Sequence, residues 1–235
     1  MNVWLVLATI IAPALFWITY FAYKDRYYPE PLRNLGSAYL LGLLAGIACA
    51  GVYGWLPRLG IPEDPSLLME NQPLAFFGYC LAVVGGLEEI FKFLPFLLII
   101  FGFRKFDDRM DGIIYASLIA LGFASVENVG YLTISRGFDL FGRAVAVPLT
   151  HTIFSSIWGY SAGRARLAHQ PVWMPALLGL SLAAVAHGLF DFLNLAPAWR
   201  IFSALLVLAI WLWRIAVTER IQKLAAQSSS QPDGK

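Results

Sequence analysis

Two adjacent carboxylates and a lysine lie within an apolar part of the sequence. Glu88, Glu89 and Lys92 fall inside an apolar run that extends from Leu74 to Phe103. An ionisable group at the centre of a membrane helix costs about 2.5 to 3.5 kcal/mol to insert, so three of them together indicate a function. Glu88 and Lys92 share one helix face and can pair, whereas Glu89 points about 100° away. Because two close carboxylates resist ionising together, one of them suits general acid or base catalysis.

Four further ionisable residues fall within apolar runs later in the sequence: Glu127, His151, His187 and Asp191. His187 and Asp191 are four residues apart, so they share one helix face and the carboxylate can fix the tautomer of the imidazole. Imidazole and carboxylate are the donors of catalytic zinc sites, and carboxylates also activate water directly. If these residues meet the two adjacent carboxylates, the set therefore suits hydrolysis.

Each of these groups also has a structural explanation without chemistry. Lys92 can form an ion pair within its own helix, and Glu127 can reach toward water at the membrane surface. His151 can be a buried, hydrogen-bonded histidine, and His187 with Asp191 can be an isolated helix pair. The structural explanation is weakest for the adjacent carboxylates, because one lysine leaves the second acid without a partner.

The composition indicates a polytopic membrane protein. The chain has 235 residues, of which 59% are hydrophobic and only 14% are charged. In a soluble globular chain about a quarter of all residues are charged. Here the charges gather in short clusters between long apolar runs, as in proteins that cross a bilayer several times. A net charge of +2 does not indicate nucleic-acid binding, and we expect no nucleic-acid partner.

Seven apolar runs are each near the roughly 20 residues that a helix needs to cross a bilayer. Their approximate bounds are 3–23, 36–56, 74–102, 112–131, 145–163, 173–194 and 198–218. The third run is too long for one simple span, and it contains Gly85, Gly86 and Pro95, which weaken a helix. A break at the glycines would bring Glu88 closer to the outer surface. The sequence therefore predicts an all-α, polytopic membrane helix bundle of about seven transmembrane helices, with the third helix broken or kinked.

The distribution of basic residues predicts the orientation in the membrane, because cytoplasmic ends are enriched in Lys and Arg. One set of span ends holds twelve of the seventeen basic residues, and the other set holds four. We therefore expect the N-terminus outside and the C-terminus in the cytoplasm. In this orientation Glu127, His151, His187 and Asp191 all lie in the outer leaflet, within about two turns of the surface. The twelve residues expected on the cytoplasmic side are Lys24, Arg26, Arg33, Arg104, Lys105, Arg109, Arg164, Arg166, Arg214, Arg220, Lys223 and Lys235.

At these residues the sequence resembles the PrsW family of intramembrane proteases. The resemblance covers the chain from the first loop to the sixth span. It implies cleavage of membrane-anchored substrates, of which an anti-sigma factor is the best-known kind, in a bacterial plasma membrane. The matching stretches are Asp25-Arg26-Tyr27, Pro29-Glu30-Pro31, Glu88-Glu89-x-x-Lys92, Asp111-Gly112-Ile113-Ile114-Tyr115, Gly122-Phe123-Ala124, Glu127-Asn128, Pro148 with His151, and His187-Gly188-Leu189-Phe190-Asp191.

The PrsW family is distantly similar to the CAAX-type membrane endopeptidases, which carry E-E-x-x-x-R, F-x-x-x-H and H-x-x-x-N. Here Lys92 comes one residue earlier than the arginine, Glu127 replaces a histidine and Asp191 replaces an asparagine. His151 is an additional histidine. These departures give the site more acid ligands and so favour a metal. The γ-secretase scaffold subunit is a related non-catalytic member of the wider group, and it supports a non-enzyme alternative.

We therefore predict an intramembrane endopeptidase domain over residues 1–224, followed by a disordered polar tail over residues 225–235. The enzyme would sit in a bacterial inner membrane as a multi-pass protein. It would cleave single-span, anti-sigma-factor-like substrates near the extracytoplasmic face with activated water. A proton- or ion-coupled carrier and a non-catalytic membrane scaffold are the alternatives. A carrier often contains an inverted repeat, and the sequence has none that we recognise.

The predicted site residues have distinct roles. Glu88 or Glu89 would activate the water, and Lys92 would hold one carboxylate ionised. Asp191 would orient His187. A zinc ion is the expected cofactor, and the histidines with Glu127 would hold it or stabilise the oxyanion. The predicted metal ligands are Glu127, His151 and His187.

Overall fold

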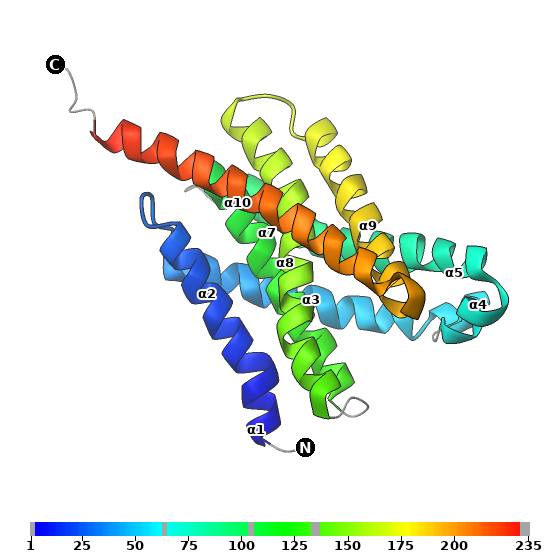
Figure 1. The fold of residues 1–235 in the computed structure, drawn as a ribbon. Helices are drawn as coiled ribbons and strands as arrows, with labels where there is room; N and C mark the ends of the chain where they lie inside the picture. The colour runs from blue at the N-terminus through cyan, green and yellow to red at the C-terminus, as the bar shows by residue number, and fades with distance from the viewer. Residues whose placement is uncertain (1–2, 63–64, 103–105, 133–136, 231–235) are drawn as a thin grey trace.

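All regular structure in the described part of the chain is helical (Figure 1). The computed structural model describes residues 3–62, 65–102, 106–132 and 137–230, and no strand occurs among them. The predicted all-α class is therefore confirmed. In chain order the elements are α1 (Val3–Val6), η1 (Leu7–Ile11), α2 (Ala12–Lys24), α3 (Leu32–Tyr53), η2 (Leu56–Leu59), α4 (Ser66–Asn71), α5 (Pro73–Tyr79), η3 (Cys80–Leu87), α6 (Glu88–Gly102), α7 (Arg109–Tyr131), α8 (Gly137–Leu167), α9 (Trp173–Leu195), η4 (Pro197–Trp199) and α10 (Arg200–Ser230).

Among the helices that the structure describes, four are by length and composition able to cross a membrane: α3, α7, α9 and α10. Their outer faces carry exposed leucines and other apolar side chains, which water would disfavour and lipid would accommodate. Leu40, Leu44 and Ile47 lie on α3, and Leu178 and Leu182 lie on α9. These features identify a multi-pass membrane protein.

The helix α7 forms the centre of the bundle and packs most extensively against α8 and α3. Its side chains from Met110 to Ser125 are buried. Close approach to α8 depends on small residues, because a Cβ atom added to Gly112 would overlap the carbonyl oxygen of Gly159. Small residues at such contacts let helix backbones meet within a membrane, where van der Waals packing drives association. The helix α7 is therefore largely shielded from lipid by the helices around it.

The third apolar run stays helical, in place of the break that we expected at Gly85 and Gly86. It consists of α5, the π-helical segment η3 and α6, with Pro95 inside α6. Gly85 serves packing, because a Cβ atom there would overlap the carbonyl oxygen of Ala184 on α9. On the α9 side, a Cβ atom added to Gly188 would likewise overlap the carbonyl oxygen of Cys80. This tight contact brings the start of α6 against the last turns of α9.

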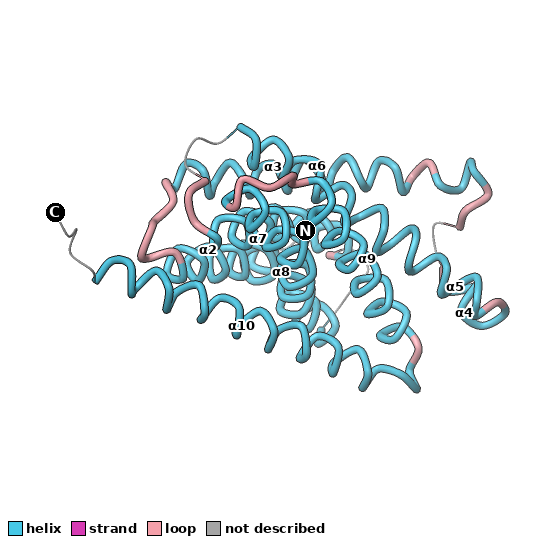
Figure 2. The backbone as a smooth tube through the Cα atoms, turned by 90° about the horizontal axis from the view of Figure 1, so that it is seen from above, coloured by secondary structure: helices cyan, strands magenta, loops and turns pink. Residues whose placement is uncertain are grey.

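The helix α10 extends further than the sequence predicted and runs along one side of the bundle (Figure 2). Residues 225–230, which we expected to begin a disordered tail, are helical, and residues 231–235 lie outside the described part. Ile221 and Ala225 are buried, and Leu, Ala and Gln are good helix formers. Because the helix continues past residue 218, Arg214 lies within the bundle, where its Nη2 donates a 2.9 Å hydrogen bond to Ser117.

One end of the bundle gathers most of the described basic residues. The end of α2 meets α10, where Gln222 Nε2 donates a 2.7 Å hydrogen bond to the carbonyl oxygen of Lys24. The loop after α2 meets the start of α7, where the Tyr115 hydroxyl donates to Glu30. The end of α8 packs against the same start of α7. Four basic residues of the sequence prediction lie outside the described residues, namely Arg104, Lys105, Arg136 and Lys235. The basic residues at this end are Lys24, Arg26, Arg33, Arg109, Arg164, Arg166, Arg220 and Lys223.

Candidate functional site

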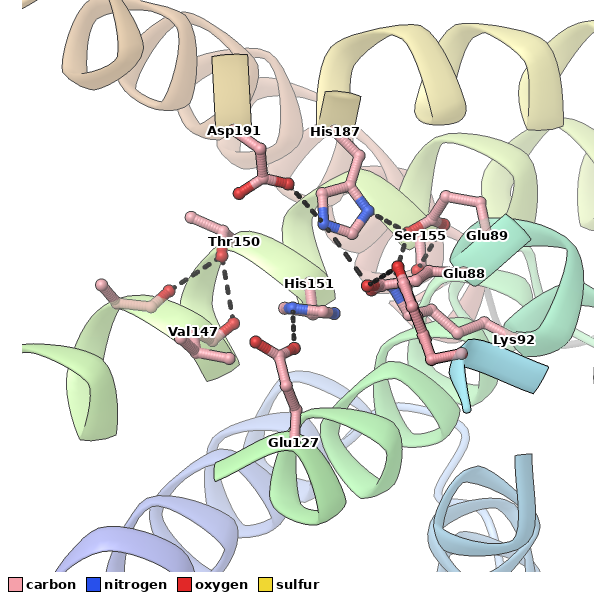
Figure 3. A network of polar contacts seen from close by, with 12 residues as sticks. Glu88, Glu89, Lys92, Glu127, Val147, Thr150, His151, Ser155, His187 and Asp191 are labelled. Atoms are coloured by element: carbon pink, nitrogen blue, oxygen red, sulfur yellow. Dashed lines mark hydrogen bonds and ion pairs between the residues drawn. The ribbon is translucent and has the colours of Figure 1, made fainter. Parts of the chain in front are cut away.

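The ionisable residues of the apolar runs meet in one cluster between four helices (Figure 3). They come from α6, α7, α8 and α9, and contacts of 2.8 to 3.9 Å join them into two groups, which meet where the rings of His151 and His187 touch. The structure thus brings together all seven residues that the sequence singled out. They are Glu88, Glu89, Lys92, Glu127, His151, His187 and Asp191.

Glu89 is completely buried, and four side chains hold its carboxylate. Lys92 Nζ donates to Oε1 at 2.8 Å, and His187 Nδ1 lies 3.1 Å from the same oxygen. Ser155 Oγ and Trp158 Nε1 donate to Oε2 at 2.8 and 2.9 Å. We expected Glu89 to point away from the face shared by Glu88 and Lys92, but its carboxylate makes the closest contact with the lysine. With both oxygens engaged, Glu89 positions its neighbours.

Glu88 is the less constrained of the two adjacent carboxylates. Its Oε1 accepts a 3.0 Å hydrogen bond from the hydroxyl of Tyr53. Its Oε2 lies 3.5 Å from Lys92 Nζ and 3.9 Å from His187 Nε2. The lysine therefore binds Glu89 more closely than Glu88. Its ammonium also lies 4.5 Å from the ring centroid of Phe123 on α7.

The rings of His151 and His187 meet edge to face, with their centroids 4.9 Å apart. Each ring meets a different carboxylate through one nitrogen. His187 Nδ1 lies 3.1 Å from Glu89, and His151 Nε2 lies 3.0 Å from Glu127 Oε2. The other nitrogen of each ring is left for a further partner. His151 Nδ1 is buried without a hydrogen-bond partner among the described residues, and His187 Nε2 lies 3.4 Å from Asp191 Oδ2.

Carboxylates that hold one imidazole nitrogen while the other faces a cavity are typical of metal sites. Glu88, His151 and His187 each offer one donor atom, and these atoms lie within 4.8 Å of one another. Two imidazoles and one carboxylate form a known donor set for catalytic zinc. We expected Glu127 as the carboxylate ligand, but it contacts His151 Nε2 instead and Glu88 completes the group. The residues present therefore fit a divalent metal.

The charges of the cluster lead to the same conclusion. Four carboxylates meet there, and the described basic side chains that pair with them are Lys92 and Arg143. If all six groups are ionised and both histidines are neutral, the cluster carries a formal charge of −2. Excess charge of one sign within a membrane is costly, so a divalent cation would stabilise this arrangement.

Arg143 is a member of the cluster that the sequence prediction missed. Its Nη2 donates a 2.7 Å hydrogen bond to Glu127 Oε1, and its guanidinium lies 3.4 Å from the ring centroid of Tyr131. Trp158 was also missed, although it lies seven residues after His151 and thus on the same face of α8. No spacing within one helix indicated Arg143, because its partner Glu127 lies on α7.

The seven residues lie far from the basic end of the bundle. Glu127 is four residues before the end of α7, and Asp191 is four residues before the end of α9. Arg109 at the start of α7 is eighteen residues from Glu127, or about 27 Å of helix rise. His151 lies near the middle of α8, which begins at Gly137. The helix starts eight residues before the apolar run over 145–163, so His151 is fourteen residues from its first residue.

Comparison with known proteins gives one consistent result. A family model described as PrsW family intramembrane metalloprotease matches residues 30–216. "Protease PrsW" of Geobacillus kaustophilus is 31% identical over 206 residues, which cover 86% of this chain and 85% of the relative. "Protease PrsW" of Oceanobacillus iheyensis is 32% identical over 217 residues, covering 90% and 93%. "Protease PrsW" of Bacillus subtilis is 28% identical over 205 residues, covering 86% and 88%. No solved structure matches the chain.

Proposed function

Because this chain belongs to the PrsW family of intramembrane metalloproteases, we propose that its four-helix cluster binds zinc and hydrolyses peptide bonds of membrane-anchored proteins. Family membership favours a peptidase over the ion-coupled carrier and the non-catalytic scaffold that composition alone left open. The observation that carries the proposal is the pair of carboxylate-held histidines. His187 Nδ1 lies 3.1 Å from Glu89 and His151 Nε2 lies 3.0 Å from Glu127, so each ring keeps one nitrogen for a metal.

In this proposal Glu88, His151 and His187 hold the metal. Glu89 and Glu127 fix the orientation of the two rings from behind, as carboxylates outside the ligand set do in other metal sites. When bound, the zinc ion supplies Lewis acidity to the attacking water and to the peptide carbonyl group. The rigid network around Glu89 keeps these donors in place, since Glu89 has both oxygens engaged.

Asp191 is the carboxylate that we assign to accept the proton of the water. Its Oδ2 lies 3.4 Å from His187 Nε2 and has no hydrogen-bond partner among the described residues. Its side chain is 24% exposed, whereas the side chain of Glu88 is 9% exposed and that of Glu89 is fully buried. Water therefore reaches Asp191 more easily than it reaches the adjacent carboxylates. The role of orienting His187, which the sequence suggested for Asp191, passes to Glu89.

We further propose that the chain crosses the bilayer seven times, with the basic end of the bundle in the cytoplasm. The excess of Lys and Arg at one end supports this orientation. The third span would then include η3, whose π-helical turns replace a sharp break. A cytoplasmic reporter fused after Ser230 should be active and a periplasmic reporter at the same position inactive. The opposite result would reverse the orientation.

The substrate in this proposal is a single-span membrane protein of the anti-sigma-factor kind, cut near the extracytoplasmic face. The position of the cut is supported by the distance of about 27 Å along α7 between the site and the basic end, which places the site toward the opposite face of the membrane.

Metal analysis of purified protein tests the proposal. The wild-type protein should retain close to one zinc ion per chain, whereas His151→Ala and His187→Ala should each lose most of it. His169→Ala is the matched control, because His169 lies outside helix α8, after its last residue Leu167, and should leave the zinc content unchanged. A wild-type protein that cleaves its substrate without any bound metal would refute the zinc site.

A further inference from the structure

A second group of carboxylates gathers at the basic end of the bundle, and the proposed peptidase site does not use it. Glu30 lies in the loop after α2, Asp107 precedes α7, and Asp111 lies in the first turn of α7. One oxygen of each carboxylate lies within 4.8 Å of the others. Asp111 and Glu127 are sixteen residues apart on α7, so about 24 Å of helix separates this group from the peptidase site.

The carboxylate of Glu30 is buried and held through one oxygen. Its Oε2 accepts hydrogen bonds from the Tyr115 hydroxyl at 2.5 Å and from Asn34 Nδ2 at 3.1 Å. Its backbone N–H donates to Asp25 Oδ2 at 2.6 Å, which fixes the loop. Glu30 is only 5% exposed, yet its Oε1 has no hydrogen-bond partner among the described residues. A fixed, buried carboxylate thus has one oxygen left to bind something else.

Asp111 repeats this arrangement. It is fully buried, and its Oδ2 accepts hydrogen bonds from the backbone N–H groups of Asp107 and Asp108 at 2.8 and 2.9 Å. The bond from Asp108 completes the capping box at the start of α7 and explains why an acid is present there. They do not explain Oδ1, which is buried without a hydrogen-bond partner in the described part of the chain. The hydrogen bonds at the start of α7 therefore explain the position of Oδ2 but give Oδ1 no partner.

No described lysine or arginine neutralises the three acids. The basic residues at the end of α2 and in the loop after it, Lys24 and Arg26, lie over aromatic rings instead. Lys24 Nζ is 5.8 Å from the ring centroid of Tyr20, and the Arg26 guanidinium is 4.7 and 4.8 Å from those of Tyr23 and Tyr27. Buried carboxylates without a cation nearby are costly. A metal cation taken up from solution would supply the missing positive charge.

We propose that Glu30, Asp107 and Asp111 form a binding site for a hard divalent cation, Ca²⁺ or Mg²⁺. The donors are carboxylate oxygens only, which these ions prefer and which zinc sites rarely consist of. A surface groove of about 540 Å³ reaches Asp107 and Asp108 and offers a route for the ion. Bound there, the ion joins the loop after α2 to the start of α7. It thereby fixes the cytoplasmic end of the central helix.

Thermal unfolding of the purified, full-length protein tests this site. The protein is freed of divalent ions with EDTA, supplied with zinc again, and then titrated with CaCl₂ or MgCl₂. At a hundredfold excess over Kd, the unfolding temperature of the wild type should rise by roughly 5 to 10 °C. Glu30→Gln and Asp111→Asn should abolish this rise. Glu70→Gln, which removes an exposed acid of α4, should keep it.

A direct measurement accompanies the unfolding experiment. Tb³⁺ occupies calcium-type oxygen sites, and Tyr115 lies close enough to Glu30 to sensitise its luminescence. Ca²⁺ or Mg²⁺ should displace the Tb³⁺ signal in the wild type and in Glu70→Gln. The proposal is wrong if the wild type gains neither stability nor luminescence. It is also wrong if its stability follows pH but not the added ions, because a proton shared between Glu30 and Asp111 would then replace the cation.

Discussion

The Nδ1 atom of His187 lies 3.1 Å from Oε1 of Glu89, although the two residues are 98 positions apart in the chain. The contact joins the start of α6 to the last turns of α9. It ties one imidazole to a carboxylate that Lys92, Ser155 and Trp158 also hold. The peptidase site is therefore built on a buried polar network whose centre is Glu89 and not its neighbour Glu88.

The first prediction concerns the stability of this network. Glu89→Gln should destabilise the protein by about 3 to 5 kcal/mol, because it removes the closer carboxylate partner of the buried Lys92 ammonium and leaves Glu88 at 3.5 Å. Lys92→Met should cost a similar amount. The double variant should be more stable than the sum of the single effects predicts, since it removes both members of the 2.8 Å ion pair together. Thermal unfolding in detergent measures all three. Additive effects would mean that Lys92 and Glu89 do not depend on each other.

The second prediction separates the roles of Glu88 and Asp191. Glu88→Gln should lower both zinc content and peptidase activity, because it weakens a metal donor. Asp191→Asn should lower activity by two to four orders of magnitude while the zinc content stays near that of the wild type. Metal analysis and cleavage of a tagged substrate, performed on the same preparations, give both values. Loss of zinc in Asp191→Asn would make Asp191 a ligand, and full activity in that variant would remove it from the mechanism.

The third prediction uses the close contact between η3 and α9. A methyl group on Gly85 would overlap the carbonyl oxygen of Ala184, so Gly85→Ala should push the two segments apart. We expect a loss of about 1 to 3 kcal/mol in stability and a marked loss of activity, because Glu89 and His187 move with these segments.

Gly78→Ala is the matched control for this variant. Gly78 lies on the preceding helix α5, and no atom lies within 4 Å of the position that its Cβ would occupy. In a helix, alanine is favoured over glycine by about 1 kcal/mol, so this variant should be as stable as the wild type or more stable. Equal behaviour of the two alanine variants would show that the η3–α9 contact tolerates separation.

The sequence was sufficient to predict the helical class and the meeting of seven ionisable residues. Both predictions depend on local patterns: apolar runs define the helices, and shared depth along them brings Glu127, His187 and Asp191 to one level. The partners of each group depend on side-chain packing between helices, which spacing does not record. Lys92 therefore binds Glu89 although its distance to Glu88 is the usual four residues, and Arg143 joins Glu127 without any sequence signal.

The π-helical segment and the end of α10 were also beyond sequence reasoning. Gly85 and Gly86 suggested a break because glycine weakens helices in water, whereas in the structure the absence of a side chain at Gly85 permits contact with α9. The last residues of α10 are polar, which suggested disorder. They stay helical up to Ser230, since Ile221 and Ala225 are buried and Gln222 bonds to Lys24.

The last prediction is the position of the cut in a substrate. In the proposed orientation the site lies about 27 Å of helix rise from the cytoplasmic end of α7, near the outer face of the bilayer. A scissile carbonyl must come within roughly 3 Å of the attacking water, and a substrate helix hides its carbonyls in its own hydrogen bonds. The substrate must therefore unwind at that depth, so cleavage should fall in its extracytoplasmic third or just outside the membrane.

Substitutions in a tagged single-span substrate test this depth. Gly or Ser near the predicted cut should speed cleavage, because they weaken the helix, and a run of Leu through the same positions should slow it. The same substitutions placed in the cytoplasmic half serve as the control and should leave the rate unchanged. Mass spectrometry of the products locates the bond. A product cut in the cytoplasmic half would mean that either the orientation or the assignment of His151 and His187 to the active site is wrong.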